Sequence, residues 1–140
     1  AVTLAQEIAL ARRYLEIEQA RFGERLRVEW SIDVAAGGAM LPPLLLQPLV
    51  ENAVKHGVEP SDTGADIRIS TQCRGGMAVI KVTNSVPAGQ GPRGNGLALD
   101  NVRDRLGLLH DLQGTFRTAL VDGVYQVRIE APLPAAGAAA

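Results

Sequence analysis

The sequence lacks the features of a secreted or membrane-spanning chain. Cys73 is the only cysteine, which excludes an internal disulfide and fits a reducing compartment. No apolar run approaches the roughly 18 to 20 residues that a membrane helix requires. No charged and then apolar signal segment opens the chain. We therefore expect a soluble domain.

An excess of charge of one sign is also lacking. The formal net charge of −1 gives no overall field that attracts nucleic acid or an acidic membrane, so nucleic acid is not an expected partner. What is present is a hydrophobic fraction of 46% in 140 residues, enough for one core. We expect a single domain over residues 1–133 and a disordered tail over residues 134–140.

Helical spacing is clearest at the beginning of the chain. Apolar residues three, four or seven positions apart predict a helix over residues 3–22 that ends at Gly23. Leu10, Tyr14 and Ile17 form a second apolar stripe on another face of this helix. The second stripe suggests contact with a further neighbour outside this chain.

The same spacing returns over residues 44–57. Pro42 and Pro43 suit the entry of this second helix, and Gly57 suits its exit. Pro48 lies early in the segment, where a proline is able to distort a helix.

Alternating apolar and polar residues mark the strands. The other predicted elements, in chain order, are a strand over 26–32, strands around 67–69 and 78–82, a loop over 85–96, a helix over 99–109 and two strands within 115–132. Gly75-Gly76 and Asp122-Gly123 predict hairpin turns. This order predicts a two-layer α/β (α+β) fold, with about three helices on one face of a mixed, mostly antiparallel sheet of about five strands.

Polar side chains crowd the end of the second helix. Asn52 and His56 continue the line of its sheet-facing leucines, and Glu51 and Lys55 lie on the same turn and its flank. Asn52 and His56 are unexpected in such a line, which makes them candidates for a binding site. The alternative is a helix end whose polar groups point into solvent, with Glu51 and Lys55 as a surface ion pair.

A second candidate is Asn84, at the end of the third strand. Strand alternation places it on the same side as Ile80 and Val82, which face the core. Asn84 is therefore expected to point into the layer between sheet and helices. The alternative is that it forms a turn at the strand end.

The third candidate is the glycine-rich run Arg93-Gly94-Asn95-Gly96-Leu97, where the last predicted helix begins. Glycines allow a ligand to approach the backbone, and the free N–H groups of a helix start favour a phosphate. A flexible connector is the alternative, because a Gly-x-Gly pattern alone is a weak motif.

Two longer segments resemble a known family. Residues 46–57, which read LQPLVENAVKHG, resemble the N box of the LytS-like sensor histidine kinases, and residues 94–106 resemble their G box and the helix after it. Residues 41–43 and 14–22 are also similar to that class. The resemblance covers nearly everything before the tail and implies the GHKL, or Bergerat, ATP-binding fold.

The resemblance also implies ATP and Mg²⁺ as ligands. Asn52 occupies the place of the family's Mg²⁺-coordinating asparagine, and an amide oxygen suits that ion. Lys55 falls where related kinases contact phosphate, and His56 falls beside the nucleotide. Gly94 and Gly96 fall on the phosphate-binding glycines of the lid.

Two positions depart from the wider superfamily. Asn84 stands where an aspartate accepts a hydrogen bond from the adenine amino group, although its side-chain oxygen is also an acceptor. Pro48 stands where some GHKL ATPases carry a catalytic glutamate, so ATP hydrolysis by water is expected to be poor. Glu51 remains as a candidate acid–base group.

Phosphotransfer in this family needs a histidine upstream of this region. Neither His56 nor His110 lies in such a context. The resemblance implies that the first helix continues from an upstream dimerisation and phosphoacceptor region. It further implies a homodimeric membrane protein with this domain in the cytoplasm. The γ-phosphate of ATP would pass to the upstream histidine and then to a response regulator.

Two other functions stay open. One is a different GHKL ATPase of the chaperone, mismatch-repair or anti-sigma type, although the glutamate or extended lid of those proteins is not visible. The other is a degenerate interaction module that has lost nucleotide binding. The reasons are Asn84 and the absence of the Asp-x-Gly-x-Gly motif that the wider superfamily carries at this place.

Overall fold

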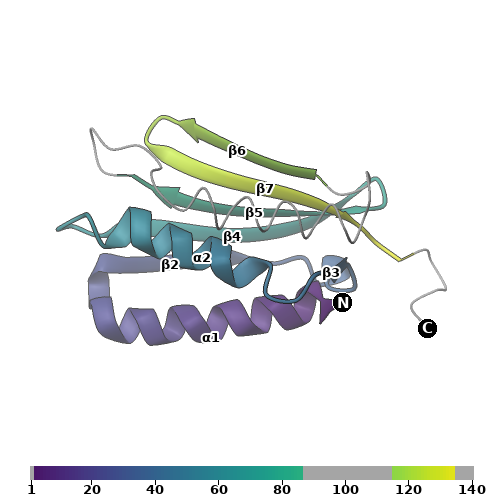
Figure 1. The fold of residues 1–140 in the computed structure, drawn as a ribbon, viewed down its shortest axis with the longest axis horizontal. Coiled ribbons are helices and arrows are strands. Elements are labelled where there is room, and N and C mark those ends of the chain that lie inside the picture. The colour runs from purple at the N-terminus through teal and green to yellow at the C-terminus, as the bar shows by residue number, and fades with distance from the viewer. Residues whose placement is uncertain (1, 87–114, 135–140) are drawn as a thin grey trace.

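The computed structural model describes residues 2–86 and 115–134, shown in colour in Figure 1. Its strands and α-helices, in chain order, are β1 (Val2–Thr3), α1 (Leu4–Phe22), β2 (Leu26–Ser31), β3 (Met40–Leu41), α2 (Leu46–Ala53), β4 (Ala65–Arg74), β5 (Met77–Ser85), β6 (Thr115–Val121) and β7 (Val124–Pro132). Three short helical turns complete it: η1 (Gly23–Arg25), η2 (Val34–Ala36) and the π-helical η3 (Val54–Val58).

The main sheet has five strands in the order β2-β4-β5-β7-β6. Only β2 and β4 run parallel, and the other three pairs are antiparallel, so the predicted mixed and mostly antiparallel sheet is confirmed. α1 and α2 pack side by side under this sheet (Figure 1). The third predicted helix, over 99–109, lies outside the described residues.

α1 matches the predicted helix at both ends. Thr3 is its N-cap: the Thr3 hydroxyl accepts a hydrogen bond from the Gln6 backbone N–H at 3.2 Å, and Gln6 Oε1 accepts one from the Thr3 N–H at 2.9 Å. The helix ends at Gly23, which has a φ of 60°. Because Thr3 is extended and belongs to β1, the chain enters α1 from a strand.

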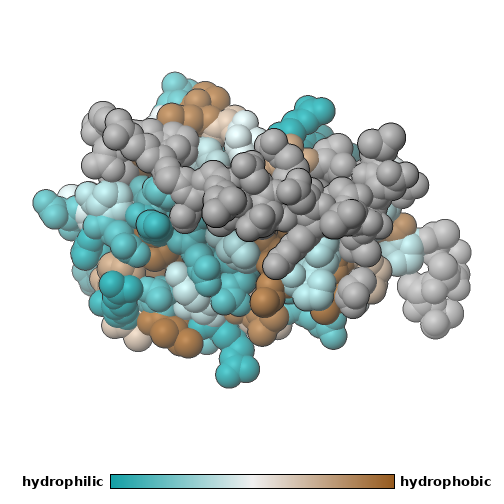
Figure 2. Space-filling view, in the orientation of Figure 1, coloured by the Kyte–Doolittle hydropathy of each residue, from teal (hydrophilic) through white to brown (hydrophobic). Residues whose placement is uncertain are grey.

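The second apolar stripe of α1 faces outward. Leu10 is 44% exposed and Ile17 is 69% exposed, whereas Tyr14 is half-buried. Figure 2 shows small hydrophobic areas between hydrophilic ones along the edge where Figure 1 places α1. No helix in the described part of the chain is long and apolar enough to cross a membrane.

α2 differs from the prediction at both ends. Leu44 has a φ of 57° and cannot begin a helix, so α2 starts at Leu46. Pro48 is then the third helical residue, where the missing N–H removes no intrahelical hydrogen bond. The helical backbone continues through η3 to Val58, so the predicted exit at Gly57 is wrong: Gly57 is buried inside the last turn.

Both predicted hairpins are present. Gly75 and Gly76 have φ values of 57° and 78°, and Asp122 and Gly123 have values of 51° and 76°. Two consecutive positive φ angles give the turn whose twist matches that of the flanking strands. The pair β1 and β3 was not predicted, because two residues per strand are too few for alternation to be recognised.

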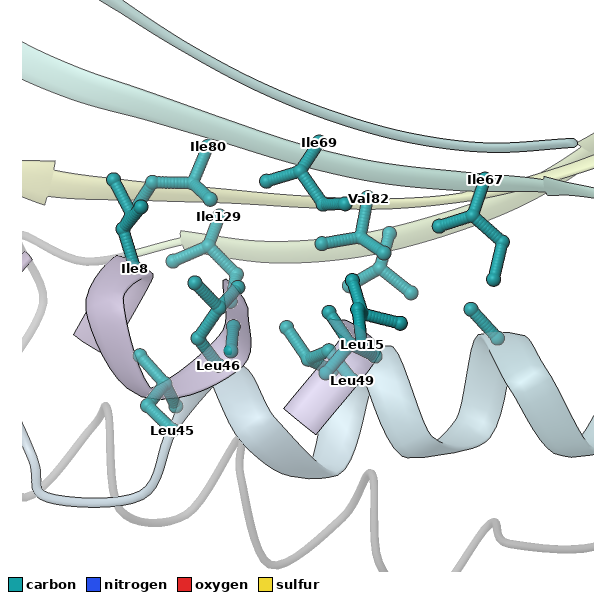
Figure 3. Close-up of a cluster of buried hydrophobic side chains, with 14 of the residues drawn as sticks. Ile8, Leu15, Leu45, Leu46, Leu49, Ile67, Ile69, Ile80, Val82 and Ile129 are labelled. Atoms are coloured by element: carbon teal, nitrogen blue, oxygen red, sulfur yellow. The ribbon is translucent and has the colours of Figure 1, made fainter. Parts of the chain in front are cut away.

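The core lies between the sheet and the two helices. Figure 3 shows isoleucine and valine side chains from β4, β5 and β7 facing leucines of α1 and α2. The labelled residues are Ile67, Ile69, Ile80, Val82 and Ile129 on the sheet and Ile8, Leu15, Leu45, Leu46 and Leu49 on the helices and the start of α2. This single core fixes the face of α2 that points toward the sheet.

Candidate functional site

Asn52 is the polar side chain that α2 turns inward. It is 4% exposed, and it continues the line of Leu45 and Leu49, which are each 1% exposed. Steps of three and four residues lay these side chains on one face of the helix. Asn52 is therefore buried, and the solvent-directed alternative does not apply to it.

Glu51 and Lys55 lie on the outer side of the same helix end. Both are exposed, and Glu51 Oε1 accepts a hydrogen bond from Gln47 Nε2 at 3.1 Å. None of the ion pairs in the described ranges joins Glu51 to Lys55. Lys55 is thus placed as an ammonium group at the surface one turn beyond Asn52.

His56 is half-buried on η3, one residue after Lys55. Its Nε2 atom is buried and has no hydrogen-bond partner within the described residues. Burial and, next, the charge of Lys55 lower the pKa of His56, although Glu59 acts in the opposite direction. At neutral pH the imidazole is therefore uncharged, with one nitrogen available to a ligand.

Asn84 lies on the inner face of β5, as strand alternation predicts. It is 2% exposed and stands in the sheet ladder between Ile67 of β4 and Tyr125 of β7, so it does not form a turn. Its Nδ2 donates a hydrogen bond to the Ser85 carbonyl oxygen at 3.1 Å. The side-chain amide is thus held at the end of the strand, among core residues.

Gly57 brings the end of α2 and η3 against the end of β5. A Cβ atom at Gly57 would lie 3.1 Å from the Ser85 carbonyl oxygen and 3.2 Å from Asn84 Nδ2. Contacts this short are tighter than side chains normally tolerate. Two of the three predicted site regions, one on a helix and one on a strand, therefore meet in the structure.

The third region is not placed. Arg93, Gly94, Asn95, Gly96 and Leu97 lie outside the described residues. Their assignment to a phosphate-binding lid stays a prediction.

Two residues that hold this region were missed from the sequence. Glu7 of α1 is buried and accepts hydrogen bonds from the backbone at the start of α2. Arg25 donates to the carbonyl oxygens of Val58 and Ser61 at 3.0 and 2.7 Å and so ties down the chain after η3. The sequence does mark Glu7 as unusual, because a carboxylate three residues after Leu4 interrupts the apolar stripe of α1. Arg25 had none.

Known proteins similar in sequence are sensor kinases, although no family model matches the chain. Sensor histidine kinase YesM of Bacillus subtilis is 35% identical over 112 residues, which cover 76% of this chain and 19% of YesM. Sensor histidine kinase YpdA of Escherichia coli is 36% identical over 120 residues, covering 78% of this chain and 21% of YpdA. The chain thus spans about a fifth of the length of these relatives.

Solved structures of similar fold are more distant in sequence. The nucleotide-free catalytic domain of histidine kinase ThkA matches with a TM-score of 0.72 and 18% identity over 92% of this chain and 94% of that domain. ThkA in complex with the response regulator protein TrrA matches with a TM-score of 0.65 and 14% identity over 94% of this chain and 40% of the ThkA chain. At such identities the match concerns the fold, which is that of histidine kinase catalytic domains.

Proposed function

Because this chain belongs to the LytS-like sensor histidine kinases, we propose that it is the domain of such a kinase that binds ATP and presents it for phosphotransfer. The observation that carries this proposal is Asn52. An amide side chain with only 4% exposure lies on the inner side of the helix that resembles the family's N box. The amide has an oxygen and a nitrogen that are able to bind a ligand at this end of the helix.

The residues around Asn52 suit a magnesium nucleotide. Mg²⁺ takes one or two protein oxygens together with phosphate oxygens and water. Asn52 would hold the ion through its side-chain oxygen, and the ion would neutralise phosphate charge. Lys55 and His56 would contact the phosphates from the following turn, together with the predicted lid over residues 93–97.

Asn84 is assigned to the adenine. Its buried amide at the end of β5 has an oxygen that accepts a hydrogen bond from an exocyclic amino group. Its nitrogen already donates to the Ser85 carbonyl, which orients that oxygen. Glu51 is the proposed acid–base group because it is an exposed carboxylate beside Asn52.

The whole protein would be a two-component kinase. The γ-phosphoryl group would leave ADP and form a phosphorus–nitrogen bond with a histidine upstream of this chain, and it would then pass to an aspartate of a cognate response regulator. The role of this chain is to bind and orient ATP. We place the chain on the cytoplasmic side of a homodimeric membrane protein, where it contacts its own upstream helices.

Calorimetric titration with ATP tests this proposal. The chain should bind ATP with Mg²⁺ present and lose most of that binding when Mg²⁺ is chelated. Asn52→Ala should abolish the Mg²⁺-dependent part while the far-ultraviolet circular dichroism stays unchanged. Gln72→Ala, which removes an amide from the outer face of β4, is the control and should bind like the unmodified chain.

Two outcomes would overturn the proposal. A folded chain that binds no ATP up to millimolar concentration would indicate the interaction module instead. A folded Asn52→Ala variant with unchanged affinity would remove Asn52 from the site. Replacing Gly94 and Gly96 by alanine tests the lid separately, because a phosphate lid should affect ATP more than adenosine.

A further inference from the structure

The start of α2 is capped by a residue of another helix. Glu7, in the first turn of α1, is 2% exposed. Its Oε1 accepts hydrogen bonds from the backbone N–H groups of Leu45 at 2.6 Å and Leu46 at 2.9 Å, and its Oε2 accepts one from Leu44 at 3.2 Å. One buried carboxylate thus contacts three consecutive backbone donors, 37 to 39 residues along the chain.

α2 has no cap of its own. Its N-cap residue is Leu45, and no neighbouring side chain forms a capping hydrogen bond. The first N–H groups of a helix have no intrahelical partner, and they form its positive end, so a carboxylate placed there is strongly favoured. In return, a buried carboxylate is tolerated only where charge or hydrogen bonds compensate for lost water.

Glu7 is itself fixed in place. The first turn of α1 donates backbone hydrogen bonds to the segment that leads into α2, from Leu4 to the Ala39 carbonyl at 2.8 Å and from Ala5 to the Gly37 carbonyl at 3.1 Å. Strand β1 pairs with β3 beside these contacts. The Glu7 carboxylate is therefore held in place by α1, and the start of α2 is positioned by its hydrogen bonds to that carboxylate.

Apolar packing alone does not set this position. Leu46 and Leu49 decide which face of α2 meets the sheet, but apolar contacts are not directional and tolerate sliding along the helix axis. Hydrogen bonds of 2.6 to 3.2 Å to three successive N–H groups do not tolerate it. Asn52 follows six residues after Leu46, so it moves with the start of the helix.

We infer that Glu7 is a positioning residue for the nucleotide site: it fixes the start of α2 and thereby places Asn52. This inference rests on the proposed ATP site, but the contact between Glu7 and α2 is measurable without nucleotide. Glu7 does not touch the ligand in this assignment. It acts through the backbone of α2.

The test compares two variants at Glu7 with two controls. Glu7→Ala removes all acceptors, and Glu7→Gln keeps one oxygen if alanine prevents folding. Glu16→Ala removes an exposed carboxylate from the same helix. Val79→Ala shortens a buried side chain on the opposite face of β5 from Ile80, and it controls for a general loss of stability. Hydrogen exchange of the backbone amides of residues 44–52 and the affinity for Mg²⁺ and ATP are measured on each.

Glu7→Gln should raise amide exchange in residues 44–52 more than in β4 and β5, and it should weaken ATP binding several-fold. Glu7→Ala should weaken it at least about tenfold, because hydrogen bonds to a charged group are lost. Both controls should keep the affinity of the unmodified chain. Faster exchange in α2 with unchanged affinity, or exchange raised equally throughout the sheet, would overturn the inference.

Failure of the proposed function would look different. If the unmodified chain binds no ATP, the exchange pattern still decides whether Glu7 holds α2. If the amide exchange of Glu7→Gln is identical to that of the unmodified chain, this result alone overturns the positioning role of Glu7.

Discussion

The backbone of Gly57 lies so close to the side chain of Asn84 that a Cβ atom at Gly57 would stand 3.2 Å from Asn84 Nδ2. This approach joins the end of the helical segment that carries Asn52 to the end of β5. It explains why a glycine is needed inside the last helical turn, where it has no capping role. The close contact also leaves Asn84 Nδ2 directed at the Ser85 carbonyl.

Gly57→Ala should therefore disturb the nucleotide site. The added methyl group meets the Ser85 carbonyl oxygen, the Ala65 side chain and the Asn84 amide, and we expect a loss of about 1–3 kcal/mol in the free energy of unfolding. ATP affinity should fall further than stability alone explains, because Asn84 is displaced. Urea unfolding and calorimetric titration measure the two effects. If Gly57→Ala binds ATP with unaltered affinity, Asn84 does not contribute to the nucleotide site.

Gly64 is predicted to be the least replaceable glycine of those described. A Cβ atom there would lie 1.9 Å from the Arg25 carbonyl oxygen, which is backbone and cannot turn aside. Gly64→Ala should cost about 3 kcal/mol or more of stability. Gly75→Ala is the matched control, since Gly75 also has a positive φ but has no neighbour within 4 Å. The control should lose only about 1–2 kcal/mol from backbone strain. If Gly64→Ala and Gly75→Ala lose the same free energy of unfolding in urea, the predicted clash at Gly64 is wrong.

His56 should make stability fall on acidification. Its pKa in the folded chain is below the ordinary 6.5, so between the two values the unfolded chain binds more protons. Stability then rises with pH through that window and levels off above about 6.5. His56→Gln should reduce the difference in melting temperature between about pH 7.5 and pH 5. The other titrating groups are the same in both chains, so an unchanged difference would mean that His56 titrates normally.

Asn84→Asp should affect stability and binding in opposite directions. The carboxylate cannot donate to the Ser85 carbonyl and is buried, so we expect a loss of about 1–3 kcal/mol at neutral pH. The loss should shrink near pH 4, where a protonated carboxyl group donates again. A charged acceptor binds an amino group more strongly, so ATP affinity should rise relative to that of the unmodified chain. Weaker ATP binding by a folded variant would argue against adenine contact at this position.

Much of the fold was predictable because its signals are local. The helix over residues 3–22 needs only the spacing of its own apolar residues, and each hairpin needs only two turn residues with positive φ. The inward direction of Asn84 follows from strand alternation, and its buried position confirms it. The resemblance to sensor histidine kinases came from two contiguous segments, and the relatives of the chain confirm it.

What the sequence determined by itself is the two long helical segments and the five main strands of the described ranges, the inward faces of Asn84 and of the apolar residues, and the family. Only the tertiary structure decided that Glu7 caps α2, that Arg25 holds the chain after η3, and that Gly57 closes on Asn84. The physical reason is distance along the chain. Periodicity reports contacts between residues a few positions apart, whereas Glu7 and Leu45 are 38 residues apart and meet only after both helices have packed on the sheet.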